Sequence, residues 1–340
     1  MADSAPFGEA LPPPQLSVVL STLGNHDLLR RVLDGYEEQS SPPATFELIV
    51  VADRAEPDMN AVRAAVGERP YPLRLLVGTR PGLSANRNAG WTAARGAIVL
   101  FTDNDTIPAP RLVSEHLATH RLHPAEEVAV TGLVRWARGL RVTPFMRWLE
   151  HGIQFDFDGI RGEEASWAHL YGANASIKRG LLARVGGYDE DNLPYGYEDL
   201  DWGFRARSEG LRVVFNRRAI VDHWRTMTVG DWQARAPRLA LSEWRFCQLH
   251  PEVRPWFQTM FADAAAVAPG GRRSAAVTRL IPPRTPWLGP LIWSRAGLHW
   301  RQQIAPAFLA AWQAACEGRA PELQPAVSAL AERGESSGGS

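Results

Sequence analysis

The feature that most constrains the fold is a regular alternation of strand-like and helix-like segments in the first third of the chain. Short runs rich in β-branched and apolar residues lie at 16–21, 46–52, 73–77 and 97–102. Segments with apolar residues at helical spacing lie between them, at 27–39, 59–66 and 85–95. Ser84 is placed to cap the last of these helices and Gly96 to end it. Alternation of this kind predicts an α/β fold with a doubly wound, mainly parallel, Rossmann-like sheet.

The pattern loosens in the second half. Strands are predicted at 128–134, 172–177, 213–215 and 219–222, and helices at 179–185 and 198–209, whereas 139–167 has no clear period. The remaining chain is rich in tryptophan, helix-like and interrupted by prolines. We therefore expect an α/β domain over 16–225 and a helical extension over 226–330. Polar or proline-rich ends predict a disordered lead-in at 1–15 and a disordered tail at 331–340.

Composition excludes several classes of function. The 340 residues carry a formal net charge of zero and no dense basic stripe, so a nucleic-acid partner is not expected. Cys247 and Cys316 are too far apart to suggest a disulfide framework or a zinc site. The N-terminus lacks a basic-then-apolar export pattern, and no apolar run is long enough to span a bilayer. We therefore expect a cytoplasmic protein.

Asp103-Asn104-Asp105 stands at the end of the apolar run 97–102. Open α/β sheets bind ligands at the carboxyl ends of their strands, so the two carboxylates are placed to meet a ligand. Oxygen ligands of this kind suit Mg²⁺ or Mn²⁺, and such an ion would bind a diphosphate. Asp and Asn are also common turn formers, and this stretch alone does not separate a metal site from a turn.

Other polar clusters follow predicted strands or open predicted helices. Asp53 follows the run 46–52, where it would accept from a nucleobase or a ribose hydroxyl, or cap a turn. Arg87 and Asn88 lie in the first turns of the helix after Gly82, where they would meet phosphates or only solvent. His223 follows the strand predicted at 219–222 and is either a further metal ligand or a structural histidine.

A third acidic cluster, Glu198-Asp199 with Asp201, is flanked by aromatic residues. A helix dipole stabilises carboxylates in the first turn, and Asp201 has Arg205 as an i+4 partner, so a purely structural role is available. Glu198 and Asp199 have no basic residue at i+4. A carboxylate held among aromatic residues has a raised pKa and can serve as a general base.

Taken together, residues 16 to about 223 resemble the GT-A domain of a family 2 glycosyltransferase. The matching motifs occur in the order of that family. They are 18–23, Asp53, 82–90 with Arg87-Asn88-Ala89-Gly90, the Asp103-Asn104-Asp105 (DxD) motif, 172–175, 186–189, and 197–201 with Arg205 and Gly210. The resemblance divides the domain into a nucleotide-sugar half, 16–106, and an acceptor half, 107–225.

The resemblance implies a role for each matching residue. Asp53 would bind the base of a nucleotide-sugar with Thr22 and Leu23 nearby, although Ala52-Asp53-Arg54 departs from the family pattern and Arg54 leaves open a donor with an extra anionic group. Asp105 would ligate Mn²⁺ or Mg²⁺ bridging the diphosphate, Asp103 would contact the ribose or the metal, and His223 would add a metal ligand. Asp199 would be the general base. Arg87 would sit near the nucleotide or its phosphates, and Asn88 and Asn104 would belong to the same nucleotide-sugar site. Asn174 and Glu198 would line the sugar or acceptor pocket, with Glu198 counted among the catalytic residues.

We therefore expect a metal-dependent, inverting glycosyltransferase that moves a sugar from a nucleotide-sugar, expected to be a UDP-sugar, to a hydroxyl of a glycan, a lipid-linked sugar or a natural product. One alternative is a non-catalytic nucleotide-sugar-binding or sugar-binding module on the same fold. A sugar nucleotidyltransferase is a weaker alternative, because residues 21–26 lack a basic phosphate loop.

The Trp-rich extension allows three interpretations. Its tryptophans would stack on sugars, settle at a membrane interface, or form helical core. The stretch 293–301 is the candidate for contact with a lipid surface, which would place the protein peripherally at the inner face of a membrane. A homodimer is left open.

Overall fold

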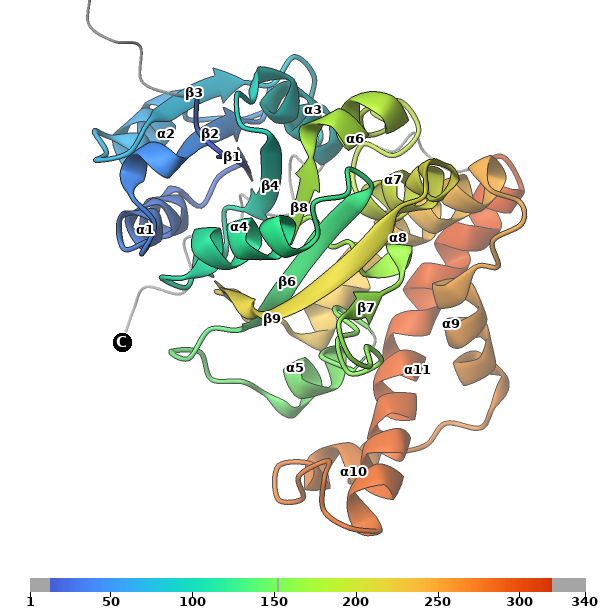
Figure 1. Cartoon of the computed structure of the whole chain (residues 1–340). Coiled ribbons are helices and arrows are strands. Elements are labelled where there is room, and N and C mark those ends of the chain that lie inside the picture. The colour runs from blue at the N-terminus through green and yellow to red at the C-terminus, as the bar shows by residue number, and fades with distance from the viewer. Residues whose placement is uncertain (1–12, 152, 320–340) are drawn as a thin grey trace, which may run out of the picture.

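The computed structural model describes residues 13–151 and 153–319. The predicted tail at 331–340, most of the predicted lead-in, and the last residues of the predicted extension lie outside these ranges. Four parallel strands form the N-terminal half of the sheet in the order β3-β2-β1-β4 (Figure 1). They are β1 (Leu16–Thr22), β2 (Phe46–Ala52), β3 (Leu73–Val77) and β4 (Ile98–Asp103). The connecting helices are α1 (His26–Glu37), α2 (Met59–Val66) and α3 (Leu83–Ala93).

The second half of the sheet is mixed. Strand β8 (Asn174–Lys178) joins β4 antiparallel, and β6 (Val128–Trp136) and β9 (Arg212–His223) follow. The short strands β5 (Thr106–Pro108) and β7 (Glu164–Ala165) pair with β9. Helices α4 (Leu112–Leu122), α5 (Pro144–Leu149), α6 (Arg179–Val185) and α7 (Glu198–Ala206) complete this half. The predicted α/β fold is confirmed, and the strands predicted at 213–215 and 219–222 are one continuous strand, β9.

The mainly apolar sequences of β1 and β2 explain why these strands form the core of the parallel half. Every residue of both strands is buried, as expected for a sheet that helices cover on both faces. Gly96 is needed because the backbone of β1 approaches it closely: a Cβ there would lie 2.7 Å from the Ser17 nitrogen. The expected caps of α3 are wrong, since the helix begins at Leu83 and ends at Ala93. The Ser84 hydroxyl instead donates to the Leu193 carbonyl.

The C-terminal extension is helical and forms a second core. It consists of α8 (Val229–Leu249), α9 (Trp256–Ala266), α10 (Arg272–Val277) and α11 (Leu288–Cys316), and the long α11 packs along α8 and α9 (Figure 1). Trp232, Trp293 and Trp300 are buried in this core with Phe145 and Trp148. The helical-core interpretation is therefore right for Trp293 and Trp300, which do not face solvent, whereas Trp232 also lines the pocket described below.

Candidate active site

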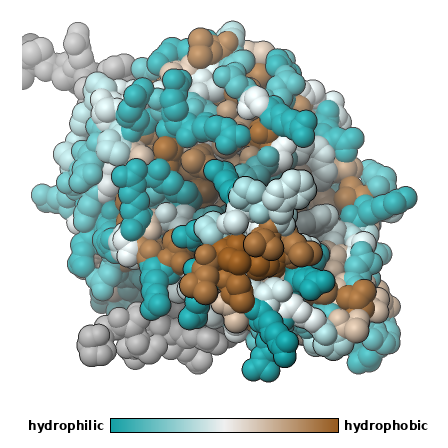
Figure 2. Space-filling view, turned by 90° about the horizontal axis from the view of Figure 1, so that it is seen from below, coloured by the Kyte–Doolittle hydropathy of each residue, from teal (hydrophilic) through white to brown (hydrophobic). Residues whose placement is uncertain are grey.

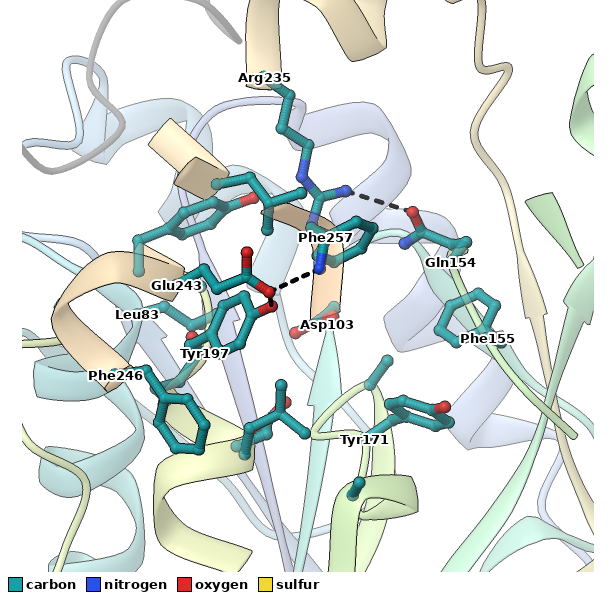
Figure 3. A pocket seen from close by; sticks show the side chains of 18 of the residues that line it. Leu83, Asp103, Gln154, Phe155, Tyr171, Tyr197, Arg235, Glu243, Phe246 and Phe257 are labelled. Carbon is teal, nitrogen blue, oxygen red and sulfur yellow. Dashed lines mark hydrogen bonds between the residues drawn. The ribbon is translucent and has the colours of Figure 1, made fainter. Parts of the chain in front are cut away.

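A pocket of about 600 Å³ opens where the parallel strands end and the C-terminal helices begin. Asp103 lies at the carboxyl end of β4, with side chains from α8 and α9 facing it (Figure 3). The strand-end wall comprises Ser21, Thr22, Leu23, Asp53, Asn86, Arg87 and residues 103–105. The opposite wall comprises Tyr197, Trp232, Arg235, Leu239, Glu243, Phe246 and residues 253–257. One wall is thus polar and the other mainly aromatic.

Asp53 holds the polar wall together. Its Oδ2 accepts hydrogen bonds from the Gly82 nitrogen and from Asn86 Nδ2, both at 2.8 Å. Its Oδ1 accepts from the Ala55 nitrogen at 2.8 Å. The carboxylate therefore caps the turn after β2 and fixes the start of α3, and it also lines the pocket. The two interpretations of Asp53, a turn cap and a pocket residue, are compatible.

Arg87 lies at the centre of a buried cluster of carboxylates. Its Nη1 donates to Glu198 Oε1 at 2.8 Å and to Asp199 Oδ1 at 2.5 Å, and its Nη2 is 3.5 Å from Asp103 Oδ1. Burial disfavours the charge of the guanidinium, but these carboxylates outweigh burial and raise the pKa of Arg87. The guanidinium was expected near phosphates, and its contacts are instead with the acids of α7 and β4.

Asp199 has the electrostatics of a base that works near neutral pH. Burial raises the pKa of this carboxyl from 3.8 to about 7, against the opposing effect of Arg87 and with a further increase from Glu198. Its Oδ2 accepts from the Gly172 nitrogen at 2.8 Å, so both oxygens are held in place. Glu198 Oε2 is buried and has no hydrogen-bond partner among the described residues. The two carboxylates lie side by side at the start of α7.

Asp105 and His223 form the part of the site that suits a divalent cation. His223 Nε2 is 3.3 Å from Asp105 Oδ2, and Arg225 Nη1 is 3.9 Å from the same oxygen. Burial raises the pKa of Asp105, but His223 and Arg225 outweigh it and the net pKa is lowered. Burial raises the pKa of Asp103 in spite of Arg87. The surroundings thus favour the ionised form of Asp105 and disfavour that of Asp103.

The candidate metal ligands fit a cation only in part. No three acidic, histidine or cysteine side chains converge on one point among the residues that the structure describes. The expected set of Asp103, Asp105 and His223 is therefore not preassembled. Mn²⁺ or Mg²⁺ is commonly held by one or two carboxylates together with the phosphates of a substrate. Asp105 supplies one such carboxylate next to the pocket, and the His223 imidazole beside it is a further possible ligand.

Three asparagines that were expected in the binding pocket serve the fold. Asn88 Nδ2 donates to the Tyr188 carbonyl and to Glu190, and Asn174 Nδ2 donates to the Leu133 and Ala219 carbonyls. Neither side chain lines the pocket. Asn104 does line it, and its Nδ2 donates to Thr22 Oγ1 at 3.0 Å. The amides of Asn88 and Asn174 thus stabilise the fold away from the pocket, whereas Asn104 holds a loop and also faces the pocket.

Glu243, which the sequence analysis did not single out, is the polar anchor of the aromatic wall. This buried carboxylate accepts from the Tyr197 hydroxyl at 2.5 Å and from the first three backbone nitrogens of α9 (Figure 3). It therefore joins α8 and α9 to the residue that precedes Glu198. The sequence did carry a signal for Glu243. Its spacing from Leu239 and Phe246 puts this acidic residue on the buried face of the predicted helix, where a carboxylate needs hydrogen-bond donors.

Comparisons with known proteins identify the family of the chain. Residues 13–239 match the family model described as glycosyltransferase like family 2. Validoxylamine A glucosyltransferases from Streptomyces hygroscopicus subsp. limoneus and subsp. jinggangensis are 26% and 25% identical to the chain. Both alignments cover 71% of this chain, but only 58% and 62% of those proteins, so the chain spans about three fifths of their length.

A solved structure shows the same fold. The mannosyltransferase from Pyrobaculum calidifontis in complex with GDP-Man and Mn²⁺ superposes with a TM-score of 0.52 at 21% sequence identity. The superposition covers 94% of this chain and 81% of the mannosyltransferase. The curled α/β sheet followed by helices is therefore a GT-A fold.

Proposed function

The chain belongs to the family described as glycosyltransferase like family 2, and from this membership we propose that it is a metal-dependent, inverting glycosyltransferase that uses a nucleotide-sugar. The observation that carries the proposal is the convergence in one pocket of Asp199, whose pKa is about 7, and the pair Asp105–His223. The first group suits proton removal near neutral pH, and the second suits the charge of a diphosphate.

The nucleotide-sugar would bind along the polar wall. Asp53, Thr22 and Leu23 line the end at which we place the base, and Asp103 stands between that end and Asp105. Asp105 and His223 would hold Mn²⁺ or Mg²⁺. When bound, the cation neutralises the diphosphate and makes it a better leaving group. We expect a UDP-sugar, and because the superposed mannosyltransferase was solved with GDP-Man, GDP-sugars belong in the same test.

The acceptor would bind against the aromatic wall. The Asp199 carboxylate takes the proton of an acceptor hydroxyl as the hydroxyl oxygen attacks the anomeric carbon, while the bond from that carbon to the diphosphate breaks and its electron pair leaves with the diphosphate. A single displacement inverts the configuration. Arg87 keeps Asp199 and Glu198 oriented, and its charge limits how far burial raises the pKa of Asp199.

Aromatic rings such as Phe246 and Phe257 offer apolar faces on which a sugar or a cyclic natural product can stack. The relatives named validoxylamine A glucosyltransferases support a small natural-product acceptor, beside the glycan and lipid-linked acceptors that we also expect. We place the enzyme in the cytoplasm, where its free thiols Cys247 and Cys316 suit a reduced compartment.

A donor panel tests the proposal directly. Purified protein would be incubated with UDP- and GDP-sugars and Mn²⁺, with and without candidate acceptors, and release of the nucleoside diphosphate would be followed. We expect release with one donor class, its loss on addition of a chelator, and its recovery when Mn²⁺ is restored. Binding of nucleotide-sugars without turnover with any acceptor would favour the non-catalytic module, and no binding at all would refute the proposal.

A further inference from the structure

The free end of the α10–α11 hairpin carries a cluster of exposed apolar side chains. This end, which we call the hairpin tip, comprises α10, the connector 278–287 and the first turn of α11, and it protrudes at the bottom of Figure 1. Its exposed apolar residues are Val277 (37% exposed), Leu280 (82%), Trp287 (93%), Leu288 (54%) and Leu291 (53%). Figure 2, seen from that side, shows an apolar patch with hydrophilic side chains around it. Isolated exposed leucines are common, but a cluster of this kind marks an interaction surface.

The most exposed of these residues has a strained backbone. Trp287 has φ 62° and ψ −46°, and the Leu288 nitrogen donates to the Pro286 carbonyl at 2.7 Å, which closes a γ-turn with a positive φ. Such turns are rare and strained, and positive φ is especially unfavourable for a bulky side chain. An indole that is 93% exposed makes little packing to offset this strain. Because packing does not offset the backbone strain, we infer that Trp287 has a functional role at this exposed position.

The charge around the tip has a single sign. From Ala264 to Cys316 the chain contains six arginines and no aspartate or glutamate. The five arginines of this stretch that face solvent are Arg272, Arg273, Arg279, Arg284 and Arg295. The whole chain has a formal net charge of zero, so the arginines here are a local excess. Exposed apolar and tryptophan side chains in a segment whose only charged residues are arginines complement an anionic lipid surface.

We propose that the hairpin tip docks the protein peripherally on an anionic lipid bilayer. Trp287 and the neighbouring leucines enter the boundary between headgroups and acyl chains, and the arginines bind the lipid phosphates. The docking is reversible and lies on one face of the bilayer. Within the described residues, none of the helices combines the length and apolar character needed to cross a membrane. The proposal stands independently of the sugar-transfer reaction, because none of the tip residues lines the pocket.

Two adjacent Arg-Leu pairs allow a matched test. Arg279 and Leu280 lie in the tip, whereas Arg121 and Leu122 end α4 elsewhere on the surface, and Leu122 is 75% exposed. The full chain and the double variants Arg279→Gln/Leu280→Ser and Arg121→Gln/Leu122→Ser would be floated with vesicles of phosphatidylcholine alone or of equimolar phosphatidylcholine and phosphatidylglycerol. The parent and the α4 variant should bind the anionic vesicles at low ionic strength and release at high salt. The tip variant should bind about tenfold or more weakly, because one immersed leucine alone accounts for about tenfold.

A third variant separates docking from folding. Trp287→Asn removes the indole but places at the γ-turn a residue that tolerates positive φ, so its thermal unfolding temperature should be equal to or above that of the parent, while vesicle binding falls. Equal binding of the parent and both tip variants would overturn the proposal. Binding that does not depend on anionic lipid would also overturn it. So would a concentration-dependent dimer that the tip variants abolish in the absence of vesicles, since the tip would then be an interface between copies.

Discussion

Replacement of Asp199 by asparagine removes the carboxylate of the proposed base and leaves the side chain almost the same shape. Loss of a positioned general base lowers rates by about 10²–10⁴-fold, which corresponds to about 3–5 kcal/mol in the activation free energy. Asp199 is not among the residues that we place against the nucleotide or the cation, so the affinity for the nucleotide-sugar should remain within about twofold of the parent. The assay is steady-state release of nucleoside diphosphate with a saturating acceptor, with donor affinity measured separately by calorimetry.

The pH profile provides a second readout of the same variant. Because the base is active when it is deprotonated and its pKa is about 7, kcat of the parent should rise with pH through about 7 and level off above it. Asp199→Asn should lose this rise of kcat with pH, together with most of its value of kcat. A parent profile that is flat from pH 5 to about 9 would contradict the assignment, as would near-normal turnover by Asp199→Asn, which would move the role to Glu198.

Asp199→Asn should not lower the stability of the fold, although it replaces a buried residue. A carboxyl whose pKa is raised from 3.8 to about 7 destabilises the fold above pH 7 by up to about 4 kcal/mol, because the folded state must hold the charge that burial disfavours. Lost hydrogen bonds from Arg87 and Gly172 offset part of the gain. Asp199→Asn should therefore be at least as stable as the parent at pH 8 by denaturant unfolding, and a loss above about 2 kcal/mol would refute the electrostatic argument.

Asp201→Asn is the matched control, since Asp201 lies on the same helix but does not line the pocket. Its buried carboxylate binds Arg205 Nε and His250 Nε2, each at 2.8 Å. Breaking a buried pair of this kind costs about 3–5 kcal/mol. This variant should lose stability and keep the rate constant of the protein that remains folded, the reverse of Asp199→Asn.

Three further predictions concern the groups around the pocket and the core beneath it. Arg87→Gln leaves the carboxylates of Glu198, Asp199 and Asp103 without their cation, so it should cost about 3–5 kcal/mol in unfolding free energy, and the kcat limb should shift above pH 7. An unshifted limb would show that Arg87 does not set the pKa of Asp199. Glu243→Gln places an amide against the backbone nitrogens at the start of α9 and should cost about 2–4 kcal/mol in chemical denaturation, whereas the exposed control Glu252→Gln should change stability little. Burial lowers the pKa of His116 to about 4 and that of His120 to about 3 from the ordinary 6.5, so the folded state holds them neutral. Their stabilising contribution is complete above pH 6.5 and should decline as the pH falls, by up to about 1.4 kcal/mol per pH unit for each histidine. Because the raised pKa of Asp199 has the opposite effect in this pH range, the measurement is made in Asp199→Asn, and a constant unfolding free energy of that variant between pH 6.5 and 5 would contradict the prediction.

The parallel half of the sheet was predictable because its pattern is local. Strand β2 (Phe46–Ala52), for example, is apolar except for one residue, Glu47, and it begins and ends where composition changes, as is usual for buried parallel strands. The predicted range of β2 agrees with the structure at both ends. In the second half, β9 was predicted as two strands because the polar residues Asn216 to Arg218 interrupt its apolar pattern. The structure pairs it with β6 through an irregular register at that point, which no local pattern reveals.

The partners of the site residues were less predictable than the residues themselves. Arg87 and Asp199 are 112 positions apart, and only the packing of α3 against the start of α7 brings them together. The sequence pattern identified both residues but not that one neutralises the other. Asn88 was expected in the pocket because it stands beside Arg87 in one motif. Its side chain instead forms hydrogen bonds with the backbone carbonyl and nitrogen of Tyr188. The aromatic wall depends on how α8 and α9 fold back over the sheet, which helical periodicity does not determine.

The central claim is that Asp105 holds a cation that binds the donor diphosphate, independently of the base. Titration calorimetry of nucleoside diphosphate into the full chain, with and without Mn²⁺, tests it most directly when the parent, Asp105→Ala and Asp199→Asn are measured side by side. We predict Mn²⁺-dependent binding by the parent and by Asp199→Asn, and at least a tenfold loss in Asp105→Ala, about 1.4 kcal/mol or more. Equal Mn²⁺-dependent affinity in the parent and Asp105→Ala would contradict the claim.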